Sequence, residues 1–379
     1  MGTLDGRVAI ITGAGRGIGR EHALLFAREG AAVVVNDLGG ANDGTGSDAG
    51  PAQQVVDEIV AAGGRAVANT DNVADWAGAE ALVAQAVREF GRLDILVNNA
   101  GILRDSFIAG MEESQWDAVI AVHLKGHAAT LHHAAAYWKA QAKAGEPVQA
   151  AVINTASASG TFMPNAGQGN YGAAKAGIAA LTLVAADELE RYGVRVNAIA
   201  PIARTRLTLA TPGMGALFAA EVPEGEFDAF APSNISPLVA RLAAADCKLT
   251  GKVYAVQGGA ISELINWHGG DTIESDGRGR STTSPSGWAE RMARNGYELG
   301  IGLSDEHVAL ADSVRAFAER TITAEHVRAA VEARTEDRFP PFWSALAGQD
   351  LLGLAVPEDR GGHGGLLTLC GGARSTGAD

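Results

Sequence analysis

Short apolar runs alternate with longer segments rich in alanine, leucine, glutamate and arginine along the first two-thirds of the chain. The runs are rich in β-branched residues and apolar at consecutive positions, which is typical of parallel strands buried on both faces. The predicted strands span residues 8–11, 33–35, 65–68, 93–97, 150–153, 194–199 and 253–256. The predicted helices span residues 17–29, 51–62, 75–90, 113–140, 170–192 and 233–245. This alternation predicts an α/β fold, a doubly wound parallel sheet with helices on both faces.

The alternating pattern ends near residue 268, where a polar stretch rich in glycine and serine begins. Helical periodicity resumes after Ser304, a favourable N-cap that acidic residues follow. The last residues show no period. The sequence therefore predicts an α/β domain at 1–268, a linker at 269–298, a small α-helical fragment at 299–366 and a disordered tail at 367–379.

Composition restricts the classes of function to consider. The chain has 379 residues, 47% of them hydrophobic, and a formal net charge of −14. Its acidity argues against binding to nucleic acid or to an anionic membrane, because both require a basic surface. The two cysteines, Cys247 and Cys370, form no pattern typical of disulfides or metal sites, so we expect no metal. The N-terminus carries no targeting pattern and no apolar run is long enough to span a bilayer, so we expect a cytoplasmic protein.

A glycine-rich loop, Thr12-Gly-Ala-Gly-Arg-Gly-Ile-Gly19, separates the first predicted strand from the first predicted helix. Glycines let a pyrophosphate approach the backbone, and the helix N-terminus supplies N–H groups and positive dipole. An acidic residue ends the second strand 18 residues after Gly19, near the ~20 expected for a group that binds ribose hydroxyls. A tight turn without a ligand is the alternative, but this context favours a Rossmann-like dinucleotide site. Its candidate cofactor-binding residues are Gly13, Arg16, Gly17, Ile18, Gly19 and Asp37.

Two opposing charges bear on the choice between NAD and NADP. The Asp37 carboxylate would repel a 2′-phosphate, whereas Arg16 could bind one. We expect NAD, with NADP as the alternative.

The motif Asn-Asn-Ala-Gly at residues 98–101 follows the fourth predicted strand. Residues at the carboxyl ends of parallel strands face the ligand crevice of such a sheet. Asn and Gly also form ordinary turns, so the motif alone decides nothing.

Tyr171 and Lys175 lie at positions i and i+4 of a predicted helix, so their side chains share one face. A free tyrosine has a pKa of ~10 and is a poor acid–base group at neutral pH. A neighbouring ammonium stabilises the phenolate, so we expect Lys175 to lower the pKa of Tyr171. Taken alone, a Tyr-x-x-x-Lys pair is common and mostly structural.

Ser157 follows a buried strand in Asn154-Thr-Ala-Ser-Ala-Ser-Gly160, and its hydroxyl could donate to a carbonyl oxygen. With the glycine loop, Asn-Asn-Ala-Gly and Tyr-x-x-x-Lys in this order, the chain resembles the short-chain dehydrogenase/reductase family over roughly residues 4–268. The resemblance implies that Tyr171 exchanges a proton with the substrate, that Lys175 tunes Tyr171 and holds the nicotinamide ribose, and that Ser157 orients the substrate oxygen. The further cofactor contacts that it implies are Asp71 and Asn72 at the adenine, Asn98, Ala100 and Gly101 at the adenosine side, and Pro201 and Ile202 at the nicotinamide. Tyr171 and Lys175 are also among the expected cofactor-binding residues.

Two positions depart from the family's pattern. The family usually has an Asn on the helix after Asn-Asn-Ala-Gly, where this chain has His123, which could support a water relay. The spacing of 14 residues between Ser157 and Tyr171 makes Ser159 a rival catalytic serine. We expect Ser157, because Ser157-x-x-Gly160 fits the family's local pattern.

Three stretches, Val-Val-Asn-Asp-Leu-Gly-Gly, Val-His-Leu-Lys-Gly and Gly-Gln-Gly-Asn-Tyr, are similar to one branch of the family. That branch contains the 3-hydroxyacyl-CoA dehydrogenase module of peroxisomal multifunctional β-oxidation enzymes, 3-oxoacyl-carrier-protein reductases and steroid 17β-alcohol dehydrogenases. The resemblance implies reversible hydride transfer between NAD and a secondary alcohol or ketone. We expect a 3-hydroxyacyl-CoA as substrate, with a steroid alcohol as the alternative. A non-catalytic dinucleotide-binding or partner-binding module is the alternative from another class.

Residues 202–232 are the expected substrate lid. Arg204 and Arg206 within it could meet the phosphates of a thioester or serve surface solubility. The family resemblance also implies a homo-oligomer, a tetramer or dimer, with the helices at 113–140 and 170–192 as the expected interfaces.

Residues 303–365 resemble the first helices of an acyl-CoA dehydrogenase. The flavin-binding sheet and the catalytic glutamate of that family have no counterpart, so we expect no FAD and no acyl-CoA dehydrogenation by this segment. A helical fragment cut off within a domain buries only part of its apolar surface. We expect a fused or frameshifted reading frame, with a selected two-domain protein as the alternative.

Overall fold

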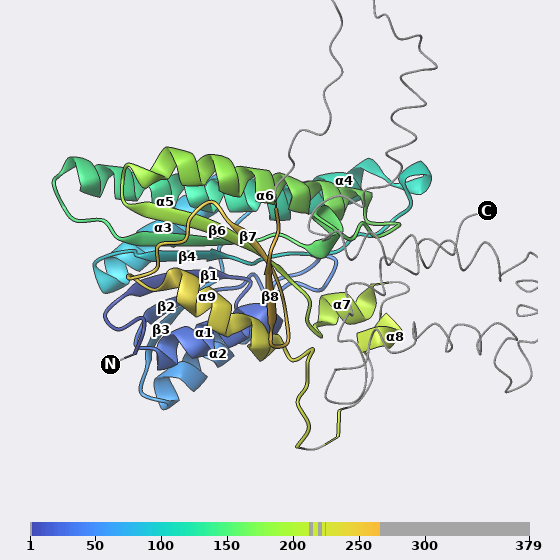
Figure 1. Ribbon diagram of the computed structural model, residues 1–379, viewed down its shortest axis with the longest axis horizontal. Coiled ribbons are helices and arrows are strands. Elements are labelled where there is room, and N and C mark those ends of the chain that lie inside the picture. Colours follow the sequence, from blue (N-terminus) through green and yellow to red (C-terminus); the bar gives the residue numbers. More distant parts are fainter. Residues whose placement is uncertain (1, 212–214, 219–221, 224, 266–379) are drawn as a thin grey trace, which may run out of the picture. The chain divides into compact units, whose positions relative to one another are not determined.

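The strands form one sheet in the part of the chain that the computed structural model describes, residues 2–211, 215–218, 222–223 and 225–265. Their order is β3-β2-β1-β4-β5-β6-β7-β8, and neighbours are parallel except β7 and β8 (Figure 1). The strands are β1 (Val8–Thr12), β2 (Ala32–Asn36), β3 (Arg65–Asn69), β4 (Ile95–Asn98), β5 (Ala150–Thr155), β6 (Val194–Pro201), β7 (Val253–Gln257) and β8 (Ala260–Glu263). The predicted α/β fold with a parallel sheet is confirmed.

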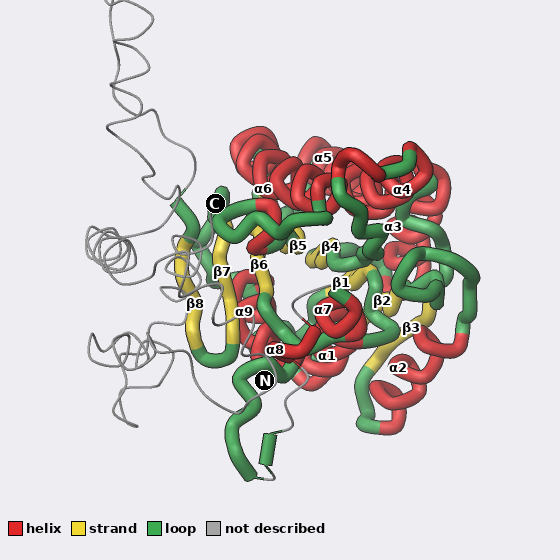
Figure 2. The backbone as a smooth tube through the Cα atoms, turned by 90° about the vertical axis from the view of Figure 1, so that its right-hand side faces the viewer, coloured by secondary structure: helices red, strands yellow, loops and turns green. Residues whose placement is uncertain are grey.

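Helices cover the sheet in two layers (Figure 2). Helices α1, α2 and α9 pack on one face, and α3, α5 and α6 pack on the other. The helices are α1 (Gly17–Arg28), α2 (Gly50–Ala61), α3 (Trp76–Phe90), α4 (Glu113–Ile120), α5 (Gly126–Lys143), α6 (Gly169–Glu190), α7 (Arg206–Ala210), α8 (Gly215–Phe218) and α9 (Ser236–Ala243). Shorter helical segments are η1 (Ile108–Gly110), η2 (Ala121–Lys125), η3 (Ala158–Gly160) and η4 (Pro232–Ile235).

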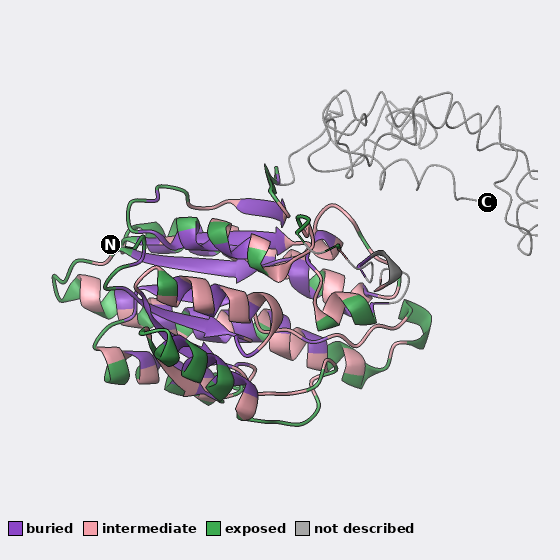
Figure 3. Cartoon of the chain, turned by 90° about the horizontal axis from the view of Figure 1, so that it is seen from below, coloured by how far each residue is buried: buried purple, intermediate pink, exposed green. Residues whose placement is uncertain are grey.

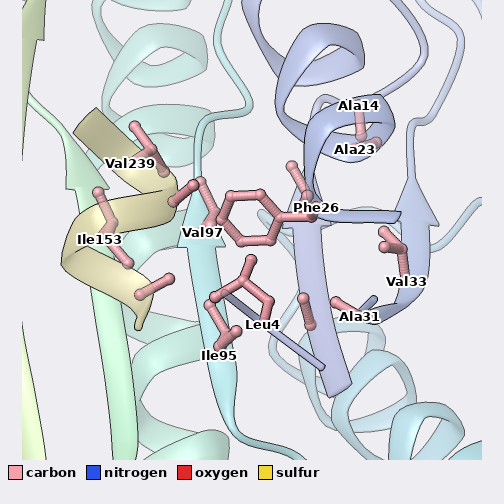
Figure 4. Packing of buried hydrophobic residues seen from close by; sticks show 14 of the residues in the cluster. Leu4, Ala14, Ala23, Phe26, Ala31, Val33, Ile95, Val97, Ile153 and Val239 are labelled. Carbon is pink, nitrogen blue, oxygen red and sulfur yellow. The ribbon is translucent and has the colours of Figure 1, made fainter. Parts of the chain in front are cut away.

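Successive residues of a central strand pack into opposite hydrophobic cores. In β1, Ala9 packs on the α1 side and Ile10 on the α3 side. Figure 4 shows the first core, where Leu4 and Phe26 lie close to Val97 of β4. The central strands are accordingly buried between helices whose outer surfaces are exposed (Figure 3). Burial on both faces explains the continuous apolar runs in the sequence.

The helix predicted at 113–140 is divided in the structure. Helix α4 ends at Ile120, the π-helical segment η2 follows, and α5 begins at Gly126. A π-helical turn is wider than an α-helical one and often occurs at functional sites. Here it carries His123. Apolar periodicity does not reveal such a turn, because the residues on both sides remain good helix formers.

The hydrophobic pattern also fails to predict β8. All four of its residues are exposed, and the strand pairs antiparallel with β7 at the edge of the sheet. The helix predicted at 233–245 begins as the 3₁₀ turn η4 before α9. The linker, helical fragment and tail predicted after residue 268 lie outside the described residues.

Among the described residues, no helix combines the length and apolar character needed to cross a membrane. In the same part of the chain, no group of three His, Cys, Asp or Glu side chains is placed to hold a metal ion. Cys247 is a buried free thiol.

Candidate active site

A crevice lies at the carboxyl edge of the sheet, near the point where β1 and β4 are neighbours. The connections from these strands proceed to opposite sides there, and open α/β sheets bind their ligands at such a switch point. The crevice has a volume of about 300 Å³. Its walls are the glycine loop, the ends of β2, β4, β5 and β6, and residues 205–208.

The side chains of Thr12 and Asn99 hold the glycine loop in place. The Thr12 hydroxyl accepts the backbone N–H groups of Asn99 at 2.9 Å and Ala100 at 3.1 Å. The amide of Asn99 donates to the carbonyls of Thr12 at 3.0 Å and Gly13 at 3.1 Å. These bonds join the ends of β1 and β4 into one rigid wall of the crevice.

The first turn of α1 faces the crevice. Its N-cap residue, Arg16, makes no side-chain capping bond, so the first N–H groups of the helix remain available to a ligand. Arg16, Gly17 and Ile18 line the crevice. Because a helix N-terminus attracts phosphate through its N–H groups and dipole, this part of the crevice fits a pyrophosphate.

Asp37 follows β2 and lines the crevice with both carboxylate oxygens held. Oδ2 accepts the N–H of Gly15 at 2.8 Å, and Oδ1 accepts the N–H of Gly39 at 2.7 Å. A carboxylate oxygen can accept more than one bond, so Asp37 can still bind ribose hydroxyls. Burial lowers the pKa of Arg206, Arg16 lowers it further and Asp37 raises it, so these three charges lie in one region.

Most of the predicted site residues line this crevice. They are Gly13, Arg16, Gly17, Ile18, Asp37, Asp71, Asn72, Ala100, Gly101, His123, Ser157, Tyr171, Lys175 and Pro201. Gly19, Asn98 and Ile202 lie outside the lining. The uncapped helix N-terminus and the carboxylate after β2 together fit a nicotinamide dinucleotide, and the roles of the single residues stay predictions.

Asn98 belongs to a buried series of polar side chains beneath the crevice, which we name the Asn98 ladder. The Thr130 hydroxyl donates to Oδ1 of Asn98 at 2.7 Å, and Nδ2 of Asn98 donates to Asn154 at 3.1 Å. Asn154 in turn donates to the Thr182 hydroxyl at 3.0 Å. The Asn98 ladder therefore crosses the core from α5 through β4 and β5 to α6.

Tyr171, Ser157 and Lys175 come together at the end of β5. The Ser157 and Tyr171 side chains both line the crevice, and Ser157 acts on the Tyr171 hydroxyl as a hydrogen-bonding group that lowers its pKa. Lys175 is buried, its Nζ donates to the carbonyl of Thr155 at 2.6 Å, and the same atom lies 5.5 Å from the ring centroid of Tyr171. This set of groups can hold a substrate oxygen and give it a proton or take one from it.

Burial dominates the ionisation of these groups. It raises the pKa of Tyr171, while the bond with Ser157 opposes the rise and the Asp105 carboxylate adds to it. Burial also lowers the pKa of Lys175 to about 7. The net shift of the Tyr171 pKa is therefore upward and set by burial, and the expectation that Lys175 lowers this pKa stays a prediction.

The turn η3 determines which serine meets Tyr171. Ser159 donates its hydroxyl to Gln168 at 2.9 Å and its backbone N–H to Oγ of Ser157 at 3.2 Å. Ser157 is thus the serine that contacts Tyr171. A Cβ on Gly160 would lie 2.5 Å from the backbone of α6, so only glycine lets the turn pack this closely. This close contact explains the spacing of Ser157-x-x-Gly160.

His123 lies edge-on to Tyr171, with ring centroids 5.1 Å apart. Its Nε2 lies 3.0 Å from the backbone N and 2.8 Å from the backbone O of Ile102, and its buried Nδ1 has no partner among the described residues. Burial and the charge of Lys175 lower the pKa of His123 to about 3, so the imidazole is neutral at physiological pH. A Cβ on Gly101 would lie 2.5 Å from the His123 ring, so the last glycine of Asn-Asn-Ala-Gly makes room for this histidine.

Asn99 and Arg206 line the crevice but are not among the cofactor residues predicted from the sequence. Asn99 stands next to Asn98, and side chains alternate along a strand, so one of the two must face away from the crevice. That alternation is the only signal in the sequence that could have distinguished them. Arg206 lies in the expected lid, and nothing in the sequence places it near Asp37.

Arg204, the other arginine of the expected lid, is held within its own segment. It forms an ion pair with Asp228 at 2.7 Å, and its Nε donates to the carbonyl of Phe218 at 2.6 Å. These contacts join the beginning of residues 202–232 to the end of the segment. Arg204 therefore stabilises the fold of this segment. The sequence analysis had considered contact with thioester phosphates and surface solubility, but not this structural role.

Comparison with known proteins identifies the family. The short chain dehydrogenase family model matches residues 7–208. Hydroxyacyl-CoA dehydrogenase ChsB1 of Mycobacterium tuberculosis is 44% identical over 281 residues, which cover 72% of this chain and 84% of that protein. The peroxisomal hydratase-dehydrogenase-epimerase of Neurospora crassa is 42% identical over 261 residues, or 69% of this chain and 27% of that protein. A short chain dehydrogenase from Mycobacterium avium, known from a crystal structure, is 54% identical with a TM-score of 0.67, covering 77% of this chain and 95% of that one.

A second family model, that of the acyl-CoA dehydrogenase N-terminal domain, matches residues 304–373. This match confirms the second resemblance and lies outside the described residues. The first match spans more than half of the chain and contains the glycine loop, Ser157 and Tyr171. The chain therefore belongs to the short chain dehydrogenase family, oxidoreductases that act on CH–OH groups with a nicotinamide dinucleotide.

Proposed function

We propose that this protein interconverts 3-hydroxyacyl and 3-oxoacyl thioesters with NAD. The contact of Tyr171 with Ser157, beside the buried Lys175 and within the dinucleotide crevice, carries the proposal. The identity of 44% with a protein named hydroxyacyl-CoA dehydrogenase supports the choice of a thioester. Reduction of the 3-oxo group consumes a hydride and a proton, and oxidation of the alcohol releases both.

The bound dinucleotide would supply or accept the hydride. Ser157 would hold the substrate oxygen through its hydroxyl, since the N–H of Ser159 already fixes its Oγ. Tyr171 would give its proton to that oxygen on reduction and take it back on oxidation. Because burial raises the pKa of Tyr171, the phenol is protonated at neutral pH. We therefore expect efficient reduction at neutral pH and oxidation that accelerates as the pH rises.

The charges around Asp37 support NAD over NADP. Two backbone N–H groups hold its carboxylate in place, so a 2′-phosphate would meet a fixed negative charge. Arg16 makes one long contact of 3.5 Å with the carbonyl of Gly40 and is held less firmly. The better-held charge therefore favours the cofactor that lacks the 2′-phosphate.

The first experiment is NADH oxidation by the full chain with acetoacetyl-CoA. We expect turnover, and faster turnover with NADH than with NADPH at equal concentration. Reduction of a steroid ketone without reduction of acetoacetyl-CoA would contradict the thioester assignment. Binding of NADH without reduction of either substrate would favour the non-catalytic module.

We also propose a cytoplasmic homo-oligomer, a tetramer or a dimer, with α5 and α6 at the interfaces. Helix α6 is rich in alanine, and its Val184 side chain is 57% exposed. Light scattering of the full chain should give a multiple of the monomer mass, and a monomer at micromolar concentration would contradict the proposal. Cell fractionation tests the location.

A further inference from the structure

Gln168 connects two loops that reach the site from different strands. It is 5% exposed and precedes α6 as its N-cap residue. Its Oε1 accepts the Ser159 hydroxyl at 2.9 Å, and its Nε2 donates to Oδ2 of Asp105 at 3.0 Å. Ser159 belongs to the turn after β5, and Asp105 to the loop after β4. We name this connection the Gln168 bridge.

The bridge reaches the proposed chemistry through Ser157. The N–H of Ser159 donates to Oγ of Ser157 at 3.2 Å, and Ser157 contacts Tyr171. These two contacts leave the Ser157 hydroxyl few orientations. A shift of the η3 turn would break the bond between Ser159 and Gln168 and would move the oxygen that meets Tyr171.

Asp105 sets the direction of every hydrogen bond in the bridge. An ionised carboxylate can only accept, so the NH₂ group of Gln168 must face Asp105. The amide oxygen must then face Ser159, and the Ser159 hydroxyl must donate. The other carboxylate oxygen of Asp105 is buried without a partner among the described residues. A buried oxygen without a partner destabilises the fold, so an acidic residue is an unfavourable choice here for stability alone.

The loop that carries Asp105 is also held directly to the beginning of α6. The side-chain amide of Asn170, which is fully buried, donates to the carbonyl of Arg104 at 2.9 Å and to that of Gln115 at 3.1 Å. The carboxylate is therefore held at a constant position relative to Tyr171.

We propose that Asp105, Gln168 and Ser159 are positioning residues that together fix the hydroxyl of Ser157 against Tyr171. None of the three needs to touch the substrate. Their effect is to keep the hydrogen bond between Ser157 and Tyr171 intact through the catalytic cycle. The catalytic meaning of this bond rests on the proposed function, but the bond itself can be tested without a substrate.

The first test follows the ionisation of Tyr171 by phenolate absorbance, as the difference between the full chain and its Tyr171→Phe variant. Among the described residues, the ionisable side chains that face Tyr171 are Lys175 from α6, His123 from η2 and Asp105 from the loop after β4. Gln168→Ala also removes a partner of Asp105, whereas Ser159→Ala leaves the bond between Gln168 and Asp105 in place. A shift in the titration midpoint of Ser159→Ala therefore reports the position of Ser157.

We expect Gln168→Ala and Ser159→Ala each to raise the midpoint, because the Ser157 hydroxyl no longer stabilises the phenolate. The double variant should shift it no further, since both changes break the same connection. The matched control is Gln53→Ala, which removes an exposed glutamine that bonds Asp57 and should leave the midpoint unchanged. Additive shifts, or no shift in either single variant, would overturn the proposal.

The second test measures turnover of acetoacetyl-CoA. Gln168→Ala should lower kcat by about tenfold or more while the KM for NADH stays constant, because the misplaced group lies on the substrate side. An unchanged kcat would overturn the proposal. If the unaltered protein reduces no acetoacetyl-CoA, the proposed function fails while the titration still decides the role of the bridge. Ser159→Ala is the second variant if Gln168→Ala unfolds, which a thermal melt will show.

Discussion

The two ends of the crevice are built from different chemical groups. Around α1, the binding surface consists of main-chain N–H groups that Thr12 and Asn99 hold in place, with one carboxylate beside them. Around Tyr171, it consists of buried side chains with shifted pKa values, and one of them, His123, keeps a ring nitrogen without a partner among the described residues. Side-chain changes at the first end should therefore adjust affinity, whereas changes at the second should remove chemistry and leave binding intact.

The most direct test of this contrast is Tyr171→Phe. Loss of the proton donor should lower the turnover of acetoacetyl-CoA by about 100- to 10,000-fold, the usual range for a general acid. The affinity for NADH, measured by fluorescence titration, should not change, because the glycine loop is untouched. Tyr192→Phe removes a phenol outside the crevice and serves as the control. Retained turnover in Tyr171→Phe would contradict the expectation that changes at the Tyr171 end of the crevice remove chemistry.

Gly101→Ala tests how tightly the catalytic end is packed. The new Cβ would lie 2.5 Å from the His123 ring, and overpacking of this kind costs about 1–3 kcal/mol of unfolding free energy. A thermal melt should show the loss, and the second change His123→Ala should recover most of it. Gly259→Ala, at a position with open space, is the control. Equal losses in Gly101→Ala with and without His123 would show that the ring is not the cause.

The pH dependence of stability sharpens the contrast, because His123 and His127 are both buried at the catalytic end with lowered pKa values. The unfolded chain binds protons at these histidines below pH ~6.5. The folded chain does not bind a proton at His123 until about pH 3. Above pH ~6.5 these histidines therefore take nothing from the free energy of unfolding. Below that pH the free energy of unfolding falls by ~1.4 kcal/mol per pH unit for each histidine.

The measurement is urea unfolding at pH 7 and pH 5. His123→Asn should reduce the loss of stability between these two pH values, and the exposed His132→Asn should leave it unchanged. A loss of the same size in all three proteins would exclude His123 as a source of the pH dependence.

At the dinucleotide end we expect the smallest effect. Asp37→Asn removes the charge that opposes a 2′-phosphate and should raise the affinity for NADPH relative to NADH by about tenfold, or ~1.4 kcal/mol. Arg206→Ala should act in the opposite direction, since its guanidinium lies in the same region. Turnover at saturating NADH should stay near that of the unaltered protein. An unchanged ratio of affinities in Asp37→Asn would remove Asp37 from cofactor selection.

The sheet could be predicted from the sequence because a strand that is buried on both faces is apolar at consecutive positions. The run Val8-Ala-Ile-Ile11 is apolar at every position, and all four residues are buried. Features that depend on tertiary contacts have no such hydrophobic pattern in the sequence. The exposed strand β8 has no apolar pattern, and among the described strands its only neighbour is β7. The π-helical turn at His123 lies between two good helices, so the pattern showed one continuous helix.

The motifs predicted residues that the structure mostly brings to one crevice, but they did not predict the contacts of each side chain. Asn98 and Asn99 are adjacent in the sequence, but in the structure Asn98 bonds Asn154 in the core whereas Asn99 holds the glycine loop. Spacing also placed Lys175 one turn from Tyr171 but could not show that its ammonium bonds Thr155. The Gln168 bridge joins residues 63 positions apart in the sequence, a relation that no local pattern contains.

The Asn98 ladder has a consequence for how precisely the site is built. Apolar side chains can slide past one another at modest cost, but the amides of Asn98 and Asn154 need their partners opposite. A slip of α6 by one turn would leave the Asn154 amide without its acceptor in the core, at about 1–3 kcal/mol, while the Thr182 hydroxyl would keep its bond to the Ile178 carbonyl of the same helix. The observed alignment of α5, β4, β5 and α6 avoids that cost. How closely Tyr171 approaches Ser157 therefore depends on buried residues that lie outside the lining of the crevice.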